Sequence, residues 1–360
     1  MLLNFVIYSF IFSLSSFQAH SLHLNKKALE KLLNGSCSPL IEINLASKSI
    51  LTIDSSTFDD CTNLISLDLS FNRIIKLHAG TFKSLLALKY LNLSNNELKS
   101  VDSGTFLGLR SLIELSLNGN RLKTLDEPFT LTPLLNLERI YLNLNEISSI
   151  SGRFFHGLPR VKCLSLNSNK IASLFSIMFR DMKNLEQLDL SNNSMAFLDP
   201  DLFRVNVNLK LLNISGNKLS YINSTTFAGL NKLTDLSLSL NKLAWLDVRI
   251  FGGLESLEFL SLSNNEITSL DNGLFGTTKY LKRVVLANNQ LASIEENVFT
   301  GLSDLAFLNL NSNQLNALST NVFDGLLATI EIKDNPISKN DPDYVKSLCA
   351  HFKSSCKIII

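Results

Sequence analysis

Twelve asparagines recur along the chain at an almost constant spacing. They are 24 residues apart, except for one step of 25 and a last step of 22: Asn72, Asn96, Asn120, Asn145, Asn169, Asn193, Asn217, Asn241, Asn265, Asn289, Asn313 and Asn335. Apolar residues precede each asparagine at fixed positions, as Leu64, Leu67 and Leu69 precede Asn72. A fixed period across most of a chain indicates a solenoid, in which each period forms one coil.

The repeated phrase also predicts the local structure of each coil. Leu67 and Leu69 are two residues apart, so in an extended segment both side chains point to one face and Asp68 points to the other. The chain must turn after this short strand, which leaves backbone groups that no sheet pairs. Because an asparagine side chain both donates and accepts, a stacked row of asparagines can satisfy those groups from coil to coil.

Phenylalanines form a second regular series, and most follow an asparagine position by ten residues. They are Phe58, Phe82, Phe106, Phe155, Phe179, Phe203, Phe227, Phe251, Phe275, Phe299 and Phe323. Stacked coils would bring these rings into one file on the side of the core opposite the strands. In the 25-residue repeat Phe129 comes nine residues after Asn120, and Leu131 takes the equivalent position. We therefore expect a small bulge near Glu127 and Pro128.

The repeats cover residues 41–337 and resemble the extracellular "typical" leucine-rich repeats of Toll and Toll-like receptor ectodomains, Slit, chaoptin and secreted insect immune proteins. This resemblance implies an α/β solenoid shaped as a horseshoe, with a parallel sheet on the concave side that binds other proteins. We expect about 13 coils, a convex side that is irregular or 3-10 helical, and short capping helices at both ends. The chain lacks the four-cysteine N-terminal cap of many of these proteins, so the resemblance points to no particular partner.

The two ends of the chain differ from the repeats. Residues 1–21 form an apolar stretch of signal-peptide length followed by small and polar residues, and we expect cleavage after Ser21. Residues 22–40 should form an N-terminal cap with a helix that stops at Asn34, and residues 338–360 a C-terminal cap with a helix that starts at Asp341. The apolar run is shorter than a membrane anchor needs, so we expect a secreted, extracellular protein without a membrane span.

Five cysteines are expected to meet an oxidising environment. Cys37 and Cys61 occupy the same position in successive coils, which predicts a disulfide, although two buried thiols would also fit these positions. Cys349 and Cys356 cannot bridge along one straight helix, so they pair only if the chain turns back after the helix, or each pairs elsewhere. Cys163 should point outward from a strand as a lone thiol; a reactive or intermolecular role is the alternative.

Five N-x-S/T sequons fit a secreted glycoprotein, although a chain rich in asparagine and serine also forms sequons by chance. The candidate glycosylation sites are Asn34, Asn92, Asn192, Asn213 and Asn223. Asn92 and Asn213 fall at outward positions of predicted strands, where a glycan would restrict access to the middle and the first half of the concave face.

Outward strand residues predict where a partner would bind. Most of them are small and polar, but Phe259, Arg283, Val285 and Phe307 fall on three neighbouring strands near the C-terminal end. Aromatic and arginine side chains commonly dominate binding energy at interfaces. A second candidate group is Tyr90, Arg139 and Tyr141. Scattered surface apolar residues are the ordinary alternative for both groups.

The composition argues against several function classes. Net charge is +1, which gives no support for nucleic-acid binding, and five scattered histidines suggest no metal site. We expect no enzyme and no cofactor. The leading hypothesis is a secreted recognition module that binds another extracellular protein or a glycoconjugate, in innate immunity, cell adhesion or developmental signalling. The alternatives are an extracellular matrix component and a secreted enzyme inhibitor or non-catalytic subunit.

Overall fold

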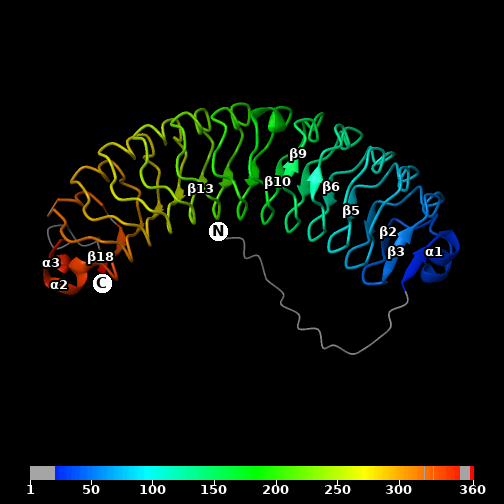
Figure 1. Cartoon of the computed structure of the whole chain (residues 1–360), viewed down its shortest axis with the longest axis horizontal. Helices are drawn as coiled ribbons and strands as arrows, with labels where there is room; N and C mark the ends of the chain where they lie inside the picture. Colours follow the sequence, from blue (N-terminus) through cyan, green and yellow to red (C-terminus); the bar gives the residue numbers. More distant parts are fainter. Residues whose placement is uncertain (1–20, 320, 327, 349–356) are drawn as a thin grey trace.

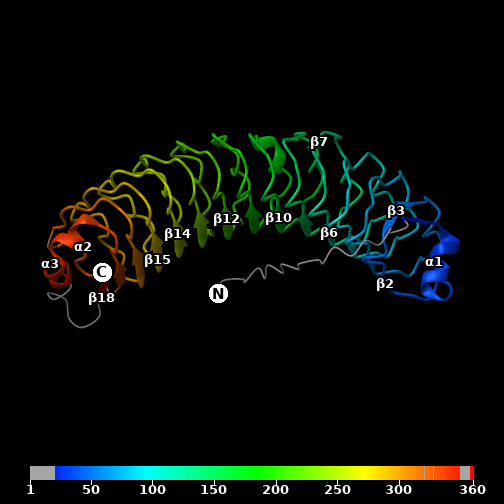
Figure 2. The ribbon, with the colours of Figure 1, turned by 60° about the horizontal axis from the view of Figure 1, so that its bottom comes forward.

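The computed structural model of the chain is a curved solenoid (Figure 1). It describes residues 21–319, 321–326, 328–348 and 357–360. Short strands follow the inner edge of the arc, and turns and loops form the outer edge, as the rotated view also shows (Figure 2). The predicted signal peptide, except for residue 21, lies outside the described residues.

One parallel sheet forms the concave side of the solenoid. Its 14 strands follow one another in chain order, with thirteen from successive coils and the last from the C-terminal segment: β2 (Glu42–Asn44), β4 (Ser66–Asp68), β5 (Tyr90–Asn92), β6 (Glu114–Ser116), β8 (Arg139–Tyr141), β10 (Cys163–Ser165), β11 (Gln187–Asp189), β12 (Leu211–Asn213), β13 (Asp235–Ser237), β14 (Phe259–Ser261), β15 (Arg283–Val285), β16 (Phe307–Asn309), β17 (Thr329–Glu331) and β18 (Lys357–Ile359). The predicted parallel solenoid is confirmed.

The strands pair in register, so equivalent residues of neighbouring coils lie side by side. Leu236 of β13 pairs with Leu260 of β14, which pairs with Val284 of β15. These three side chains are fully buried. The residues on either side of each point to the other face, because side chains alternate along a strand. The register therefore places the outward residues in columns across the concave face.

The asparagine row forms as the sequence predicts. The Oδ1 atom of each of the twelve asparagines accepts a backbone N–H of the preceding coil. Each Nδ2 group donates to a backbone carbonyl of the preceding coil and to one in its own coil. We call this row the asparagine ladder.

The phenylalanine file is also confirmed. All eleven predicted rings are at most 1% exposed, and the ring centroids of six neighbouring pairs lie 5.9–6.4 Å apart. In the 25-residue repeat Leu131 fills the file and is 1% exposed, whereas Phe129 is 42% exposed. Phe129 has a φ of +63°, which is uncommon for a bulky residue and marks the predicted irregularity next to Glu127 and Pro128.

The convex side is mostly turns, with few regular elements among the described residues. The 3-10 helix η1 (Ser176–Phe179) lies on the outer edge of the arc, where Figure 1 shows a short green coiled ribbon. Two short strands, β7 (Thr124–Leu125) and β9 (Ser149–Ile150), pair in parallel. This side thus has the irregular and 3-10 character that the sequence predicts.

The N-terminal end contains a helix, an extra strand pair and a disulfide. Helix α1 (Lys26–Leu33) ends at Asn34, which has a φ of +53°. Strand β1 (Leu22–Leu24) pairs in parallel with β3 (Ile50–Ile53), a contact that we did not predict. The structure contains the disulfide between Cys37 and Cys61, whose Cα atoms are 5.1 Å apart. Together these elements cover the first coil.

The C-terminal end differs from a purely helical cap. Helices α2 (Pro336–Asn340) and α3 (Pro342–Ser347) come first, and the Asp341 side chain caps α3 by accepting the Tyr344 N–H at 3.0 Å. Lys357–Ile359 then forms β18 beside β17 instead of continuing helical structure. β-Branched isoleucines favour a strand, and Ile358 pairs with the buried Ile330. Cys349 and Cys356 lie outside the described residues.

Candidate functional site

The C-terminal concave patch consists of Phe259, Arg283, Val285 and Phe307 on strands β14 to β16. Phe259 pairs with Arg283, and Arg283 pairs with Phe307, so the three lie side by side in one column. Val285 lies in the next column on the same strand as Arg283. The two rings and the valine are half-buried, and Arg283 is exposed. The structure therefore brings together all four residues that the sequence singles out.

Arg283 contacts one of the two rings directly. Its guanidinium carbon lies 4.6 Å from the centroid of the Phe307 ring, a cation–π geometry. Among the described residues, no carboxylate lies within ion-pair distance of Arg283. The nearby Glu331 of β17 instead accepts hydrogen bonds from the amides of Asn309 and Asn311, at 3.1 and 2.9 Å. The patch thus presents an unpaired cation on an aromatic support.

The second candidate group is organised differently. The Arg139 Nε atom donates to the Glu114 carboxylate at 2.7 Å, so this arginine is already paired. Tyr141 lies on the same strand as Arg139, next to the column that holds Cys163 of β10. Tyr90 lies two strands before Arg139, with Glu114 between them. The structure thus places Arg139 and Tyr141 beside Glu114 and Cys163, which the sequence did not assign to this group, and the strand of Glu114 separates Tyr90 from Arg139.

The pKa values of Cys163 and Tyr141 in this second cluster are raised, which favours the neutral forms of both groups. Burial raises the pKa of the Cys163 thiol, although the nearby Arg139 opposes the shift. Burial also raises the pKa of Tyr141, and its contact with Cys163 adds to the effect. A thiol with a raised pKa is a poor nucleophile near neutral pH. The geometry therefore favours a packed, unreactive Cys163.

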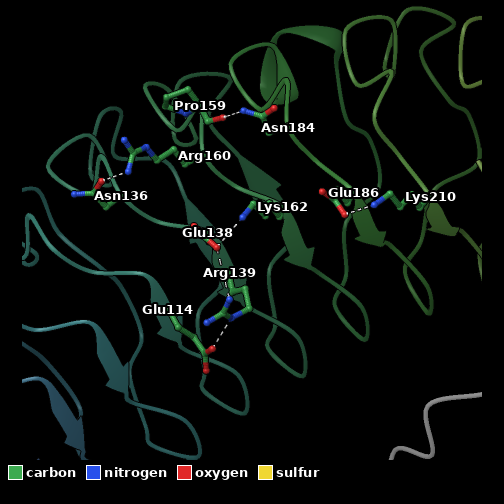
Figure 3. Close-up of polar contacts among 10 residues, drawn as sticks. All are labelled: Glu114, Asn136, Glu138, Arg139, Pro159, Arg160, Lys162, Asn184, Glu186 and Lys210. Carbon is green, nitrogen blue, oxygen red and sulfur yellow. Dashed lines mark hydrogen bonds and ion pairs between the residues drawn. The ribbon is translucent and has the colours of Figure 1, made fainter. Parts of the chain in front are cut away.

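Ion pairs between successive coils line the flank of the sheet beside this cluster (Figure 3). Lys162 pairs with Glu138 at 3.0 Å, and two coils further Lys210 pairs with Glu186 at 2.7 Å. In each pair the residues are 24 apart, so the solenoid period itself brings the charges together. These groups are partly exposed, and such pairs contribute only about 0–1 kcal/mol each. Because these charges are already paired within the solenoid, they attract a charged partner less than unpaired charges would.

The candidate glycosylation sites differ in accessibility. Asn34 and Asn192 are exposed, whereas Asn92, Asn213 and Asn223 are half-buried. Asn92 lies on β5 and Asn213 on β12, both within the concave sheet. A glycan on Asn213 would lie two strands from Phe259, which belongs to β14.

One exposed aromatic row escaped our reading of the sequence. Phe197, Tyr221 and Trp245 are 54%, 42% and 51% exposed, and the Tyr221 and Trp245 ring centroids are 5.8 Å apart. Each residue comes four positions after a ladder asparagine in three successive coils. This recurrence is visible in the sequence, but the three positions follow the ladder asparagines and so lie outside the columns of outward strand residues.

A family model described as Leucine rich repeat matches residues 38–98, 62–122, 135–195, 184–243 and 279–337, and a second model with the same description matches residues 256–277. Together these matches cover more than half of the chain. This chain belongs to the leucine-rich repeat family. Between residues 38 and 337 the matches leave out residues 123–134, which lie in the 25-residue repeat, and residues 244–255 and 278. No curated protein matches the chain in sequence.

Solved leucine-rich repeat structures share the fold. Toll of Drosophila, in its complex with Spatzle, superposes with a TM-score of 0.77 at 22% identity, over 87% of this chain and 46% of that chain. TLR13, in complex with ssRNA13, gives 0.74 at 23% identity, over 94% and 52%. The APL1 leucine-rich repeat domain gives 0.71 at 24% identity, over 94% and 88%. The chain thus spans about half the length of the Toll and TLR13 chains.

Among the described residues, no helix has the length and apolar character needed to cross a membrane. The same part of the chain holds no group of three or more His, Cys, Asp or Glu side chains that could bind a metal ion.

Proposed function

We propose that this leucine-rich repeat chain is a secreted recognition module that binds another extracellular protein or a glycoconjugate through its concave face. The observation that carries the proposal is the C-terminal concave patch, where Arg283 rests on Phe307 without a carboxylate partner in the described chain. The partner would supply the missing anion and an apolar surface for the two rings.

Physical reasons favour this patch over the rest of the concave face. Aromatic and arginine side chains carry much of the energy of interfaces, and here they sit on paired strands that fix their positions before binding. Arg139 in the second cluster already has Glu114 as its partner, so binding there would have to replace an ion pair. The proposed docking region is therefore β14 to β16, with glycans on Asn92 and Asn213 limiting access elsewhere.

The structural neighbours support a role in recognition. Toll was solved in complex with Spatzle as a hub in development and innate immunity, and APL1 shares the fold over most of its length. We propose innate immunity as the process, with cell adhesion and developmental signalling as further settings for the same binding mode. The disulfide at the N-terminal end is consistent with an extracellular location.

The test is crosslinking of the tagged protein in its native extracellular fluid, followed by identification of what it captures. Phe259→Ser with Phe307→Ser should weaken capture of a single stoichiometric partner more than tenfold, since interface anchors are worth about 2 kcal/mol or more each. The matched control replaces Leu211, an exposed apolar residue of the same column that belongs to neither candidate group, with serine. Its capture should stay unchanged.

Other outcomes would contradict the proposal in different ways. Equal capture by the patch variant and the control would remove the patch as the binding site. Self-multimers in place of a partner would point to a matrix component. A hydrolase that copurifies tightly would point to an inhibitor or a non-catalytic subunit.

A further inference from the structure

A cavity of about 470 Å³ opens on the convex side of the solenoid, away from the concave sheet. Residues from three successive coils line it: Phe129 from the 25-residue repeat, Arg153 and His156 from the next coil, and Arg180, Asp181 and Lys183 from the coil after that. Its volume is in the range typical of small-molecule sites.

The irregular repeat explains why a cavity forms at this point. Phe129 leaves the phenylalanine file and turns outward with a φ of +63°, while the smaller Leu131 fills the core. The following coil contributes Gly152, whose missing side chain lets the Ile177 side chain of the next coil approach closely, because an added Cβ would come within 2.9 Å of it. The outward-turned Phe129 ring therefore forms one wall of the cavity, and the closely packed Gly152 and Ile177 form part of its lining.

The aromatic wall of the cavity is already engaged with polar neighbours. The guanidinium carbon of Arg153 lies 5.8 Å from the centroid of the Phe129 ring. The His156 ring meets the same phenylalanine edge-on, with centroids 5.4 Å apart. Phe129 is 42% exposed and therefore brings an apolar ring and a cation together at the cavity, which suits a ring-shaped ligand that carries an anionic group.

The charges of the lining do not balance. Its one carboxylate, Asp181, contacts the His156 Nδ1 atom at 2.8 Å and accepts the Gly157 N–H at 2.9 Å. Arg153, Arg180 and Lys183 have no carboxylate within ion-pair distance among the described residues. The cavity is thus lined by three cations and by one carboxylate that already has partners. A cleft lined by charges of one sign concentrates the electrostatic potential, which is positive here.

We propose that this convex cavity binds a sugar that carries a sulfate or a phosphate ester. The guanidinium groups of Arg153 and Arg180 and the Lys183 ammonium group would hold the oxyanion, since such oxygens accept strong charge-assisted hydrogen bonds. The sugar ring would lie against Phe129, and the His156 imidazole would face its hydroxyl groups. A sulfated glycan and a free sugar phosphate both offer this chemistry.

Isothermal titration calorimetry on the purified protein separates these sources. The probes are glucose 6-sulfate, glucose 6-phosphate and, as the uncharged control, glucose. We expect at least one ester to bind and glucose not to bind. The ester that binds more tightly identifies the source, and the absence of binding by both esters would overturn the proposal.

The chain offers a matched control for the arginine. Arg180 and Arg204 both come eleven residues after a ladder asparagine in successive coils, but only Arg180 lines the cavity. Arg180→Ala should weaken binding of the ester about tenfold or more, because a hydrogen bond to a charged group is lost. Arg204→Ala should leave the affinity unchanged. Equal effects of the two substitutions would show nonspecific ion binding and refute the site.

A third variant tests the aromatic wall separately from charge. Phe129→Leu keeps all three cations and removes the ring, so it should weaken the sugar ester while leaving inorganic sulfate or phosphate unaffected. Because Phe129 is already outside the packed core, this change should not disturb folding. Retention of full ester affinity would exclude the stacked arrangement.

Discussion

The asparagine ladder makes a quantitative prediction for one rung, Asn241. Its Oδ1 accepts the Leu219 N–H at 3.0 Å, and its Nδ2 donates to the Ile214 and Leu238 carbonyls, both at 3.1 Å. These carbonyls also accept from the neighbouring rungs, Ile214 from Asn217 and Leu238 from Asn265. Asn241→Ala therefore leaves the Leu219 N–H as the one group that loses its acceptor completely.

The hydrogen bonds lost in Asn241→Ala set the expected decrease in the free energy of unfolding. A buried donor without a partner costs about 1–3 kcal/mol, and each carbonyl that keeps one of its two bonds adds less. We expect Asn241→Ala to lower the free energy of unfolding by about 2–4 kcal/mol. The control is Asn208→Ala, because the Asn208 amide also donates to the preceding coil, at 2.9 Å from the Lys183 carbonyl, but this hydrogen bond is exposed to solvent. Water replaces that bond, so its loss should cost less than about 1 kcal/mol.

The chain provides a local probe for the measurement. Trp245 is its only tryptophan and comes four residues after Asn241. Urea unfolding followed by Trp245 fluorescence should show a clearly lower midpoint for Asn241→Ala than for Asn208→Ala. Hydrogen exchange should show that the Leu219 amide loses protection. Equal midpoints for the two variants would mean that buried rungs and exposed amides contribute alike, which would refute the reasoning.

Three further predictions concern the core, a thiol and a carboxylate. Phe275→Ala should lower the free energy of unfolding by about 3–5 kcal/mol, whereas Phe129→Ala should lower it far less because the Phe129 ring lies outside the phenylalanine file. Urea unfolding measures both losses, and similar values would contradict the placement of Phe129 outside the core. Cys163 should react with iodoacetamide at pH 7.5 more slowly than a free thiol, because burial raises its pKa; mass spectrometry measures the rate, and equal rates would contradict the burial. Hydrogen bonds from Arg249 lower the pKa of Asp247 to about 2, so this contribution to stability is present above the ordinary value of 3.8 and is lost as pH falls through about 2. Arg249→Ala should move the Asp247 midpoint, followed by NMR, up toward 3.8, and an unmoved midpoint would exclude Arg249 as the cause.

The period of the sequence predicts whatever repeats. The positions of Asn72 and Phe58 follow from counting, and so do the columns of outward residues, because parallel strands in register place equivalent residues side by side. Counting also identifies Leu131 as the residue that replaces Phe129 in the core. Each coil has the same backbone groups to pair and the same core position to fill, so the same residue type recurs at the same position.

Contacts that depend on side-chain conformation or on segments without repeats could not be predicted in this way. The Arg139–Glu114 ion pair and the placement of Arg283 over Phe307 depend on side-chain rotamers, which the spacing does not specify. Strand β18 forms because a short run rich in isoleucine meets the exposed edge of β17, a contact without a counterpart in the repeats. The convex cavity lies where Phe129 turns outward from the phenylalanine file, and its lining combines residues of three coils.

Each rung of the ladder forms hydrogen bonds only within its own coil and with the coil before it, so the ladder does not depend on the total number of coils. Removing residues 218–241 as a block would join Asn217 to Lys242 and let Asn265 meet the Ile214 carbonyl, which Asn241 used to reach, in place of the deleted Leu238 carbonyl. Insertion or loss of whole 24-residue units can therefore slide the C-terminal concave patch along the arc while its chemistry stays the same. A scaffold of this kind can change its length to fit a partner of a different size while both of its ends stay the same.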